Sequence, residues 1–116
     1  MTMWKINSGR GSRFTTRFVE SGVVAVGVDE ETDFTHCSSR DEIMRLLEQK
    51  EPHLTERQVI VGASQLWRFL TEVKLGDAVL VYGPETRHYH LGAVEGPAEF
   101  RLGLIPAYPL CDRLNG

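Results

Sequence analysis

Hydrophobic residues near the N-terminus recur first at the period of a strand and then at that of a helix. In residues 3–8, Trp4 and Ile6 alternate with polar neighbours, which is the two-residue period of a strand buried on one face. Residues 14–21 place aromatic and aliphatic side chains at helical spacing, and Gly22 can adopt the left-handed conformation that ends a helix. These segments predict a strand, a glycine-containing connection and a short helix.

The middle of the chain predicts a second strand followed by two longer helices. Residues 23–28 are β-branched and almost continuously apolar, which is typical of an interior strand covered on both faces. Residues 29–35 show no period and predict a solvated acidic loop. Helices are expected over 39–50 and 55–73, because each segment opens with Ser or Thr followed three residues later by Glu or Gln, the pattern of a capping box.

The last third predicts strands that follow one another directly. Residues 78–82 and 88–94 form a hairpin, and 98–102 form a last short strand. The order β-α-β-α-α-β-β-β predicts an α+β fold with a mixed, mostly antiparallel sheet packed with helices. We expect one binding domain over 1–103. Residues 104–116 are expected to form a tail without a strand or helix, as the start of a truncated closing segment.

The composition is that of one small globular domain. At 116 residues, with 41% hydrophobic and 25% charged residues, the chain suffices for a single core. We expect a cytoplasmic protein, because no apolar stretch is long enough to span a bilayer and no signal-peptide core is visible. Cys37 and Cys111 are far apart and lack the spacing of metal ligands, which favours reduced thiols.

Charge is distributed unevenly along the chain. The net charge of −3 argues against a protein that coats nucleic acid through a basic surface. Residues 5–17, however, contain four cations and no acid, whereas residues 29–33 contain four acids. We therefore expect one positive face on an acidic domain.

Residues 9–12 imitate the glycine-rich turn of dinucleotide-binding folds, with Asp29 in the place of the acidic partner. Phe14 stands where the third glycine belongs, and no third parallel strand follows, so a mobile turn is the favoured interpretation. Backbone N–H groups beside Arg10 and Arg13 could still hold a phosphate. A nucleotide or small-molecule site in this region is therefore an alternative.

The residues that could perform catalysis or bind a metal lack the required context. His88 and His90 share one face of a predicted strand, and His36 with Cys37 could complete a zinc site, but nothing in the sequence brings them together. No Ser lies in a nucleophile elbow, and the carboxylate pairs fall in the solvated loop. We predict a binding module without enzymatic activity, cofactor or metal.

The second long helix carries side chains that can read a base. Residues 64–69 combine an amide, an indole, a guanidinium and a phenyl ring. Gln65 can pair with the edge of a base, and Arg68 can bind phosphate or lie in water. Packing in the core is the favoured role of Trp67, because its apolar neighbours on the helix face the core.

Several segments between residues 4 and 102 carry a family resemblance. They are Trp4-Lys5-Ile6 with Gly9 and Gly11, residues 22–27, residues 39–43, Gln65-Leu66-Trp67-Arg68-Phe69, residues 75–82 and residues 89–94. The whole pattern resembles the PUA-like superfamily, especially the EVE-like domains at the N-terminus of Mrr-type, modification-dependent restriction endonucleases. The Gly-Asp-x-Val-Leu turn and strand recurs in several PUA-like groups and indicates the fold more than the ligand.

The resemblance implies a PUA-like pseudo-barrel with flanking helices that accepts a modified or flipped base in a pocket. In such a pocket, aromatic stacking and hydrogen bonds to the base edge offset the cost of extruding the base. The resemblance further implies that Arg10 and Arg13 contact phosphate and that Gln65, Trp67 and Arg68 border the base pocket.

Phe14, Asp29 and Tyr82 are further candidates for the pocket. The chain departs from related sequences after the second strand, where Val28 and Asp29 stand in place of an aromatic residue. We hypothesise a recognition module for modified DNA, with RNA as the alternative, in a larger restriction or defence protein. Its partner would be a covalently linked or associated nuclease domain that this chain does not contain.

Two other classes of function stay open at this point. A nucleotide or small molecule could bind in the region from Gly9 to Asp29. The acidic loop could instead dock a basic protein partner. Steep salt dependence would distinguish nucleic-acid binding from a nucleotide pocket, because phosphate contacts release counterions.

Overall fold

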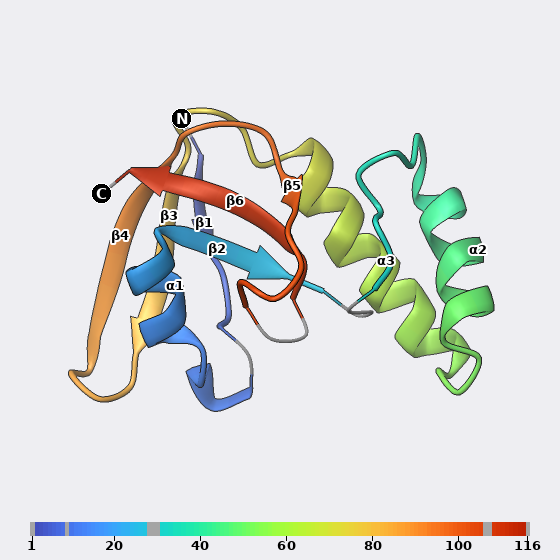
Figure 1. The fold of residues 1–116 in the computed structure, drawn as a ribbon, viewed down its shortest axis with the longest axis horizontal. Coiled ribbons are helices and arrows are strands. Elements are labelled where there is room, and N and C mark those ends of the chain that lie inside the picture. The colour runs from blue at the N-terminus through green and yellow to red at the C-terminus, as the bar shows by residue number, and fades with distance from the viewer. Residues whose placement is uncertain (1, 9, 28–30, 106–107, 116) are drawn as a thin grey trace.

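The computed structural model describes residues 2–8, 10–27, 31–105 and 108–115. The chain has an α+β arrangement in which consecutive strands follow the long helices, as the hydrophobic pattern predicts (Figure 1). The elements are β1 (Met3–Lys5), the short 3-10 helix η1 (Arg10–Ser12), α1 (Thr15–Ser21), β2 (Val23–Val26), α2 (Arg40–Lys50), α3 (Glu56–Thr71), β3 (Ala78–Gly83), β4 (His88–Val94), β5 (Glu99–Phe100) and β6 (Leu110–Asn115).

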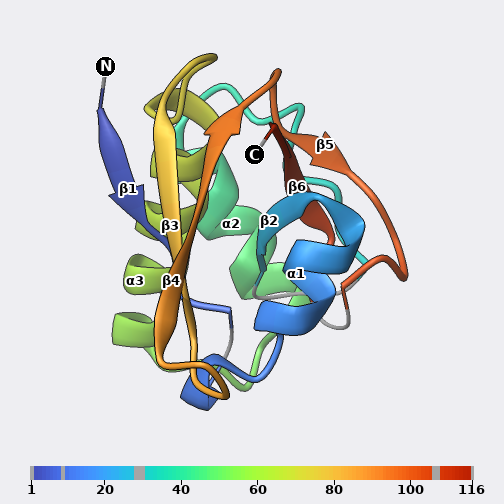
Figure 2. The same cartoon turned by 90° about the vertical axis from the view of Figure 1, so that its left-hand side faces the viewer.

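The strands form one curled, mixed sheet that resembles half of a barrel (Figures 1 and 2). Its strand order is β1-β3-β4-β6-β2, and β5 pairs with β6 beside this path. β1 runs parallel to β3, whereas the other pairs are antiparallel. Because β1 and β2 are the two ends of the strand order, the side of the half-barrel between them is not closed by strand pairing.

The predicted hairpin and helix ends are confirmed. β3 and β4 pair with Leu80 opposite Leu91, and α1 ends at Gly22, whose φ of 68° is left-handed. The side chain of Thr55 accepts a hydrogen bond from the backbone N–H of Gln58, whose side chain accepts one from Thr55 in return, so α3 starts with a complete capping box.

α2 begins with a related arrangement in which the acidic residue has a different partner. Ser39 Oγ accepts a hydrogen bond from the backbone N–H of Glu42 at 3.2 Å, as the sequence pattern predicts. The carboxylate of Glu42 accepts hydrogen bonds from the backbone N–H and hydroxyl of Ser38 instead, and these contacts lower its pKa. Ser39 therefore caps the N-terminus of α2, while Glu42 binds Ser38, one residue before the cap, instead of Ser39.

The prediction that residues 104–116 lack a strand or helix is wrong. Leu110–Asn115 forms β6, which lies between β2 on one side and β4 with β5 on the other. The sequence does not predict this strand because Asp112 interrupts its apolar residues. In the fold, Asp112 is nevertheless buried, with 1% of its surface exposed. β6 forms because it pairs with three strands whose residues lie 10 to 90 positions away in the sequence. Local periodicity could therefore not predict it.

The position of β2 corrects a second prediction. Among the described strands, β2 pairs with β6 alone and ends the strand order, so it is not an interior strand. Both of its faces are nevertheless covered, since Val24 and Ala25 are each 0% exposed. Its continuous apolar character reflects this two-sided cover by the curled sheet and the helices.

One contiguous core joins the concave side of the sheet to the helices. α2 and α3 pack against each other beside the sheet, and α1 lies near β2 (Figure 1). The largest fully buried hydrophobic side chains are Ile43, Leu47, Leu66, Ile105, Leu110, Val23, Val24 and Val79. Among the described helices, none is long and apolar enough to cross a membrane.

Candidate functional site

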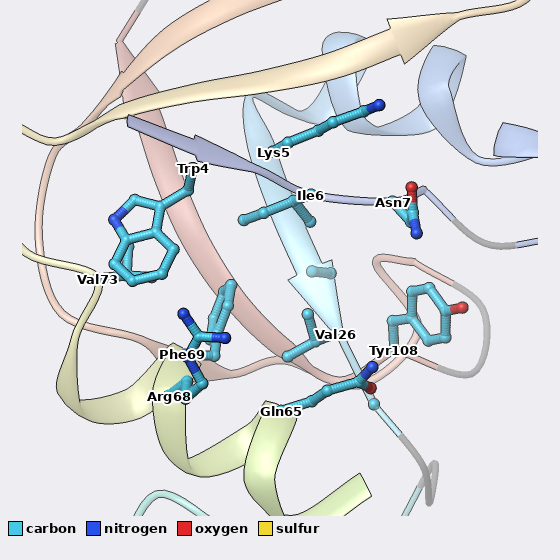
Figure 3. A pocket seen from close by; sticks show the side chains of 12 residues that line it. Trp4, Lys5, Ile6, Asn7, Val26, Gln65, Arg68, Phe69, Val73 and Tyr108 are labelled. Carbon is cyan, nitrogen blue, oxygen red and sulfur yellow. The ribbon is translucent and has the colours of Figure 1, made fainter. Parts of the chain in front are cut away.

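A cleft of about 550 Å³ lies on the unclosed side of the half-barrel, between β1, the end of β2 and α3. Figure 3 shows the side chains around it, with Trp4 and Val73 at one end and Asn7 with Tyr108 at the other. The described lining residues are Trp4, Lys5, Ile6, Asn7, Ala25, Val26, Gly27, Gln65, Arg68, Phe69, Val73 and Tyr108. The volume is within the range of roughly 300–1,000 Å³ that is usual for small-molecule pockets.

Trp4 forms an aromatic wall that is fixed by a buried carboxylate. Its indole N–H donates a hydrogen bond to Oδ2 of Asp77 at 2.9 Å. The same carboxylate accepts hydrogen bonds from the backbone N–H groups of Lys74 at 3.0 Å and Thr2 at 3.2 Å. The bond from Trp4 is the main reason that the pKa of Asp77 is lowered. The orientation of the indole is therefore set before any ligand arrives.

Arg68 places a guanidinium at the rim of the cleft. Its Cζ lies 5.4 Å from the centroid of the Trp4 ring, within the range of a cation–π contact. Its Nε donates to Oε2 of Glu72 at 3.0 Å, one turn further along α3. A guanidinium carries five N–H donors, so these two contacts orient the group and leave donors for an anionic ligand.

Gln65 and Arg68 lie three residues apart on α3 and face the same cleft (Figure 3). The Gln65 side chain is exposed, and its amide offers both a donor and an acceptor to a ligand. Phe69 belongs to the core cluster and lies below them in the cleft floor. This face of α3 therefore presents planar polar groups above an apolar floor.

The far end of the cleft is bounded by Tyr108. The Phe14 ring packs edge-on against it, with the ring centroids 5.4 Å apart. Arg13 in turn lies over Phe14, 4.6 Å from that ring centroid. Phe14 and Arg13 thus support the Tyr108 wall from outside the cleft.

The described lining of the cleft carries few charged side chains. Arg68 lines it and is paired with Glu72, whereas Lys5 borders it from β1 and extends its amine to the ring of Tyr89. Within the part of the chain that the structure describes, the lining contains no Asp, Glu, His or Cys. The N–H donors of Arg68 that Glu72 does not use are therefore the groups that an anionic part of a ligand could meet here.

Of the residues predicted from sequence, Gln65 and Arg68 are brought together in this cleft. Trp67 is not a lining residue: it is half-buried and packs against the core, as its neighbours on the helix suggest. Tyr82 lies on β3 away from the cleft, where its ring packs against Tyr89 with centroids 5.3 Å apart.

The two remaining predicted residues that the structure describes, Arg13 and Phe14, do not line the cleft. Arg13 lines a separate hollow between α1 and the β3–β4 hairpin, and Phe14 reaches the cleft only through Tyr108. Asp29 and the side chain of Arg10 lie outside the described residues. The described residues therefore do not test the alternative nucleotide site at the glycine-rich turn and Asp29.

Sequence reasoning missed several lining residues of the cleft, among them Trp4, Asn7 and Tyr108. The alternation of Trp4 with Ile6 predicts that they share a strand face. That this face of β1 lines a cleft depends on the packing of α3 and β2 beside it, which no local pattern predicts. Tyr108 lies in the segment that was expected to be a tail.

The described residues offer little for metal binding or nucleophilic catalysis. Within residues 2–8, 10–27, 31–105 and 108–115, no group of three His, Cys, Asp or Glu could hold a metal ion. Burial raises the pKa of the Cys111 thiol to about 11, and burial with Glu42 and Asp33 nearby raises that of Cys37. Neither thiol is therefore activated as a thiolate at neutral pH.

A known sequence family matches most of the chain and ends just before β6. Its description is "Domain of unknown function (DUF8426)", and the match covers residues 4–109. No curated protein and no solved structure matches the chain.

Proposed function

We propose that this chain, which belongs to that family of domains of unknown function, is a PUA-like module that recognises one base of a nucleic acid, in the first place a modified base of DNA. The resemblance of its sequence motifs to EVE-like domains motivates this choice of ligand. The α+β half-barrel with flanking helices is compatible with a pseudo-barrel of that kind.

The observation that carries the proposal is the composition of the cleft. The Gln65 amide and the Arg68 guanidinium lie on one helix, opposite a strand that presents the Trp4 indole. A base needs a flat apolar wall for stacking and donors or acceptors for its edge, and the cleft offers both. Its volume of about 550 Å³ leaves room for a base with a methyl or hydroxymethyl substituent.

Two cations near the cleft also support phosphate binding. Arg68 keeps N–H donors beyond its contact with Glu72, and Lys5 borders the cleft from β1. A phosphate attached to the bound base would lie near these groups and gain charge-assisted hydrogen bonds. Binding through so few phosphate contacts would be weak for the isolated module and stronger when it is linked to a nuclease domain, the partner that the resemblance implies.

Binding fits the cleft better than catalysis. General acid–base chemistry usually relies on His, Asp, Glu or Cys near the substrate, and none lies among the described lining residues. The walls are instead held rigid by contacts such as Trp4 to Asp77. We therefore assign recognition, and not turnover, to this chain.

A titration by fluorescence anisotropy tests the proposal. Matched DNA oligonucleotides would carry cytosine, 5-methylcytosine, 5-hydroxymethylcytosine, adenine or N6-methyladenine, in single- and double-stranded form, at low and physiological salt. We expect one modification to bind tightest and affinity to fall with salt. Gln65→Ala should weaken this binding by about tenfold, since one edge contact is worth roughly 1–3 kcal/mol.

The matched controls are Gln49→Ala on the exposed side of α2 and Arg57→Ala near the start of α3, both outside the cleft. They should bind like the unaltered chain. Equal loss in the controls, or no binding of any oligonucleotide at low salt, would contradict the proposal. Binding of free nucleotides alone, with little salt dependence, would support a nucleotide-binding function in its place.

A further inference from the structure

The convex face of β1, β3 and β4 exposes several large side chains. Along β3, Val79 and Val81 point into the core and are buried, so their neighbours Leu80 and Tyr82 lie on the opposite face. In Figure 2 this opposite face is turned to the viewer, while α3 lies behind the strands. Met3 is 61% exposed, Tyr89 50% and Leu91 59%.

The strand register brings these side chains together on one surface. Lys5 pairs with Leu80, Leu80 with Leu91, and Tyr82 with Tyr89. Directly paired residues project to the same side of a sheet. We call the resulting surface the tyrosine face, and its residues are Met3, Lys5, Ala78, Leu80, Tyr82, Tyr89, Leu91 and Ala93.

At its centre, two tyrosine rings and a cation are in contact. The Tyr82 and Tyr89 centroids are 5.3 Å apart with the rings tilted by 59°. Nζ of Lys5 lies 5.4 Å from the Tyr89 centroid. The residues of the tyrosine face include this cation and no acid. The exposed ring of Tyr89, in contact with the half-buried ring of Tyr82 and beside a cation, is suited to bases joined by phosphates.

The tyrosine face is continuous with the cleft through Lys5. Lys5 lines the cleft, and its side chain extends from β1 away from α3 (Figure 3) to the ring of Tyr89. A nucleic-acid strand with one base in the cleft would therefore pass Lys5, and its next nucleotides would lie on Tyr82 and Tyr89.

We propose that the tyrosine face binds the nucleotides that neighbour the base in the cleft, with single-stranded nucleic acid as the partner, its bases stacked on Tyr82 and Tyr89 and its phosphate near Lys5. This inference rests on the proposed function. A second copy of the chain fits the face less well, because a symmetric contact would bring two Lys5 cations together on a surface without acids.

The test compares a long and a short ligand on the full chain. The probes are a fluorescein-labelled single-stranded oligonucleotide of about nine nucleotides, long enough to leave the cleft, and the nucleoside monophosphate of its central base. That base is the one bound tightest in the titration above. Tyr89→Leu should weaken oligonucleotide binding about tenfold, because it removes one stacking ring, and should leave the affinity for the monophosphate unchanged.

Two further variants separate stacking from folding. Tyr89→Phe keeps the ring and should retain oligonucleotide affinity, whereas Leu75→Ala, an exposed hydrophobic residue outside the tyrosine face, should have no effect. Thermal unfolding of each variant checks that the domain is folded.

Each other outcome overturns the inference. If Gln65→Ala weakens the binding of both ligands but Tyr89→Leu weakens the binding of neither, the cleft is the base site and the tyrosine face has no role in binding. If neither ligand binds, the proposed function and this extension fail together. If the chain forms a dimer in sedimentation experiments that Tyr89→Leu dissociates, the partner of this face is a second copy.

Discussion

The indole N–H of Trp4 donates a hydrogen bond to Oδ2 of Asp77 at 2.9 Å, across 73 residues of sequence. Trp4 lies on β1, and Asp77 immediately precedes β3, the strand with which β1 pairs in parallel. A parallel pair needs a long connection, so its alignment depends on contacts of this kind. One hydrogen bond thus joins the sheet and also orients a wall of the cleft.

Trp4→Phe is predicted to make the protein more sensitive to acid. A carboxylate whose folded pKa is lowered stabilises the fold above its unfolded pKa, and this stabilisation is lost as the pH falls through the folded pKa. Removing the Trp4 donor removes the largest cause of the lowered pKa of Asp77. The midpoint of acid unfolding should therefore move to higher pH, as followed by the fluorescence of Trp67. An unchanged midpoint would show that the other donors suffice.

Asp112 should cause the opposite dependence on pH. It is buried on β6, and its Oδ1 has no hydrogen-bond partner among the described residues. Burial, followed by the nearby charge of Glu99, raises its pKa from 3.8 to about 7. The folded state therefore holds this proton more tightly than the unfolded state. The contribution of Asp112 to stability is greatest below pH 3.8 and decreases as the pH rises to about 7.

Asp112→Asn is therefore predicted to stabilise the protein at pH 8 and to flatten its stability between pH 4 and 7. The loss of stability across this interval in the unaltered chain is at most about 4 kcal/mol, at about 1.4 kcal/mol per pKa unit. Urea unfolding at several pH values measures it. Asp41→Asn, an exposed carboxylate on α2, is the control and should leave the profile unchanged. A profile that keeps its slope in Asp112→Asn would contradict the assignment.

Two neighbouring residues on α3 should separate stability from binding. Trp67→Ala removes a half-buried ring from the core and is predicted to cost about 2 kcal/mol of unfolding free energy. Gln65→Ala removes an exposed side chain and should change stability by less than about 0.5 kcal/mol. Urea unfolding and oligonucleotide binding measured on the same samples would test this. Loss of binding in folded Trp67→Ala alone would place the site on the other side of the helix.

Gly83→Ala is predicted to weaken the β3–β4 hairpin by about 1–3 kcal/mol. A Cβ there would lie 2.9 Å from Nε2 of His90 and 3.2 Å from the backbone oxygen of His88. The backbone contact cannot yield as easily as a side chain, so the hairpin must shift. Gly96→Ala, where no atom lies within 4 Å of the new Cβ, is the matched control. Thermal unfolding should show a lower Tm for Gly83→Ala only.

Local sequence determines the helices, their caps and the hairpin of this protein. The capping box at Thr55, the left-handed end at Gly22 and the pairing of β3 with β4 involve residues close together in the chain. Their geometry follows from a few side chains and glycines, so the sequence predicts them directly. The same locality correctly places Gln65 and Arg68 one turn apart on α3.

Tertiary structure alone decides where β6 lies and what forms the cleft. Asp112 obscures the strand pattern of β6, and Trp4, Val26 and Tyr108 meet α3 only after the sheet curls. The sequence by itself determined the α+β class and which helix carries the polar groups. The cleft and the tyrosine face depend on which strands become neighbours, because strand pairing joins residues far apart in the chain and leaves no local period to read.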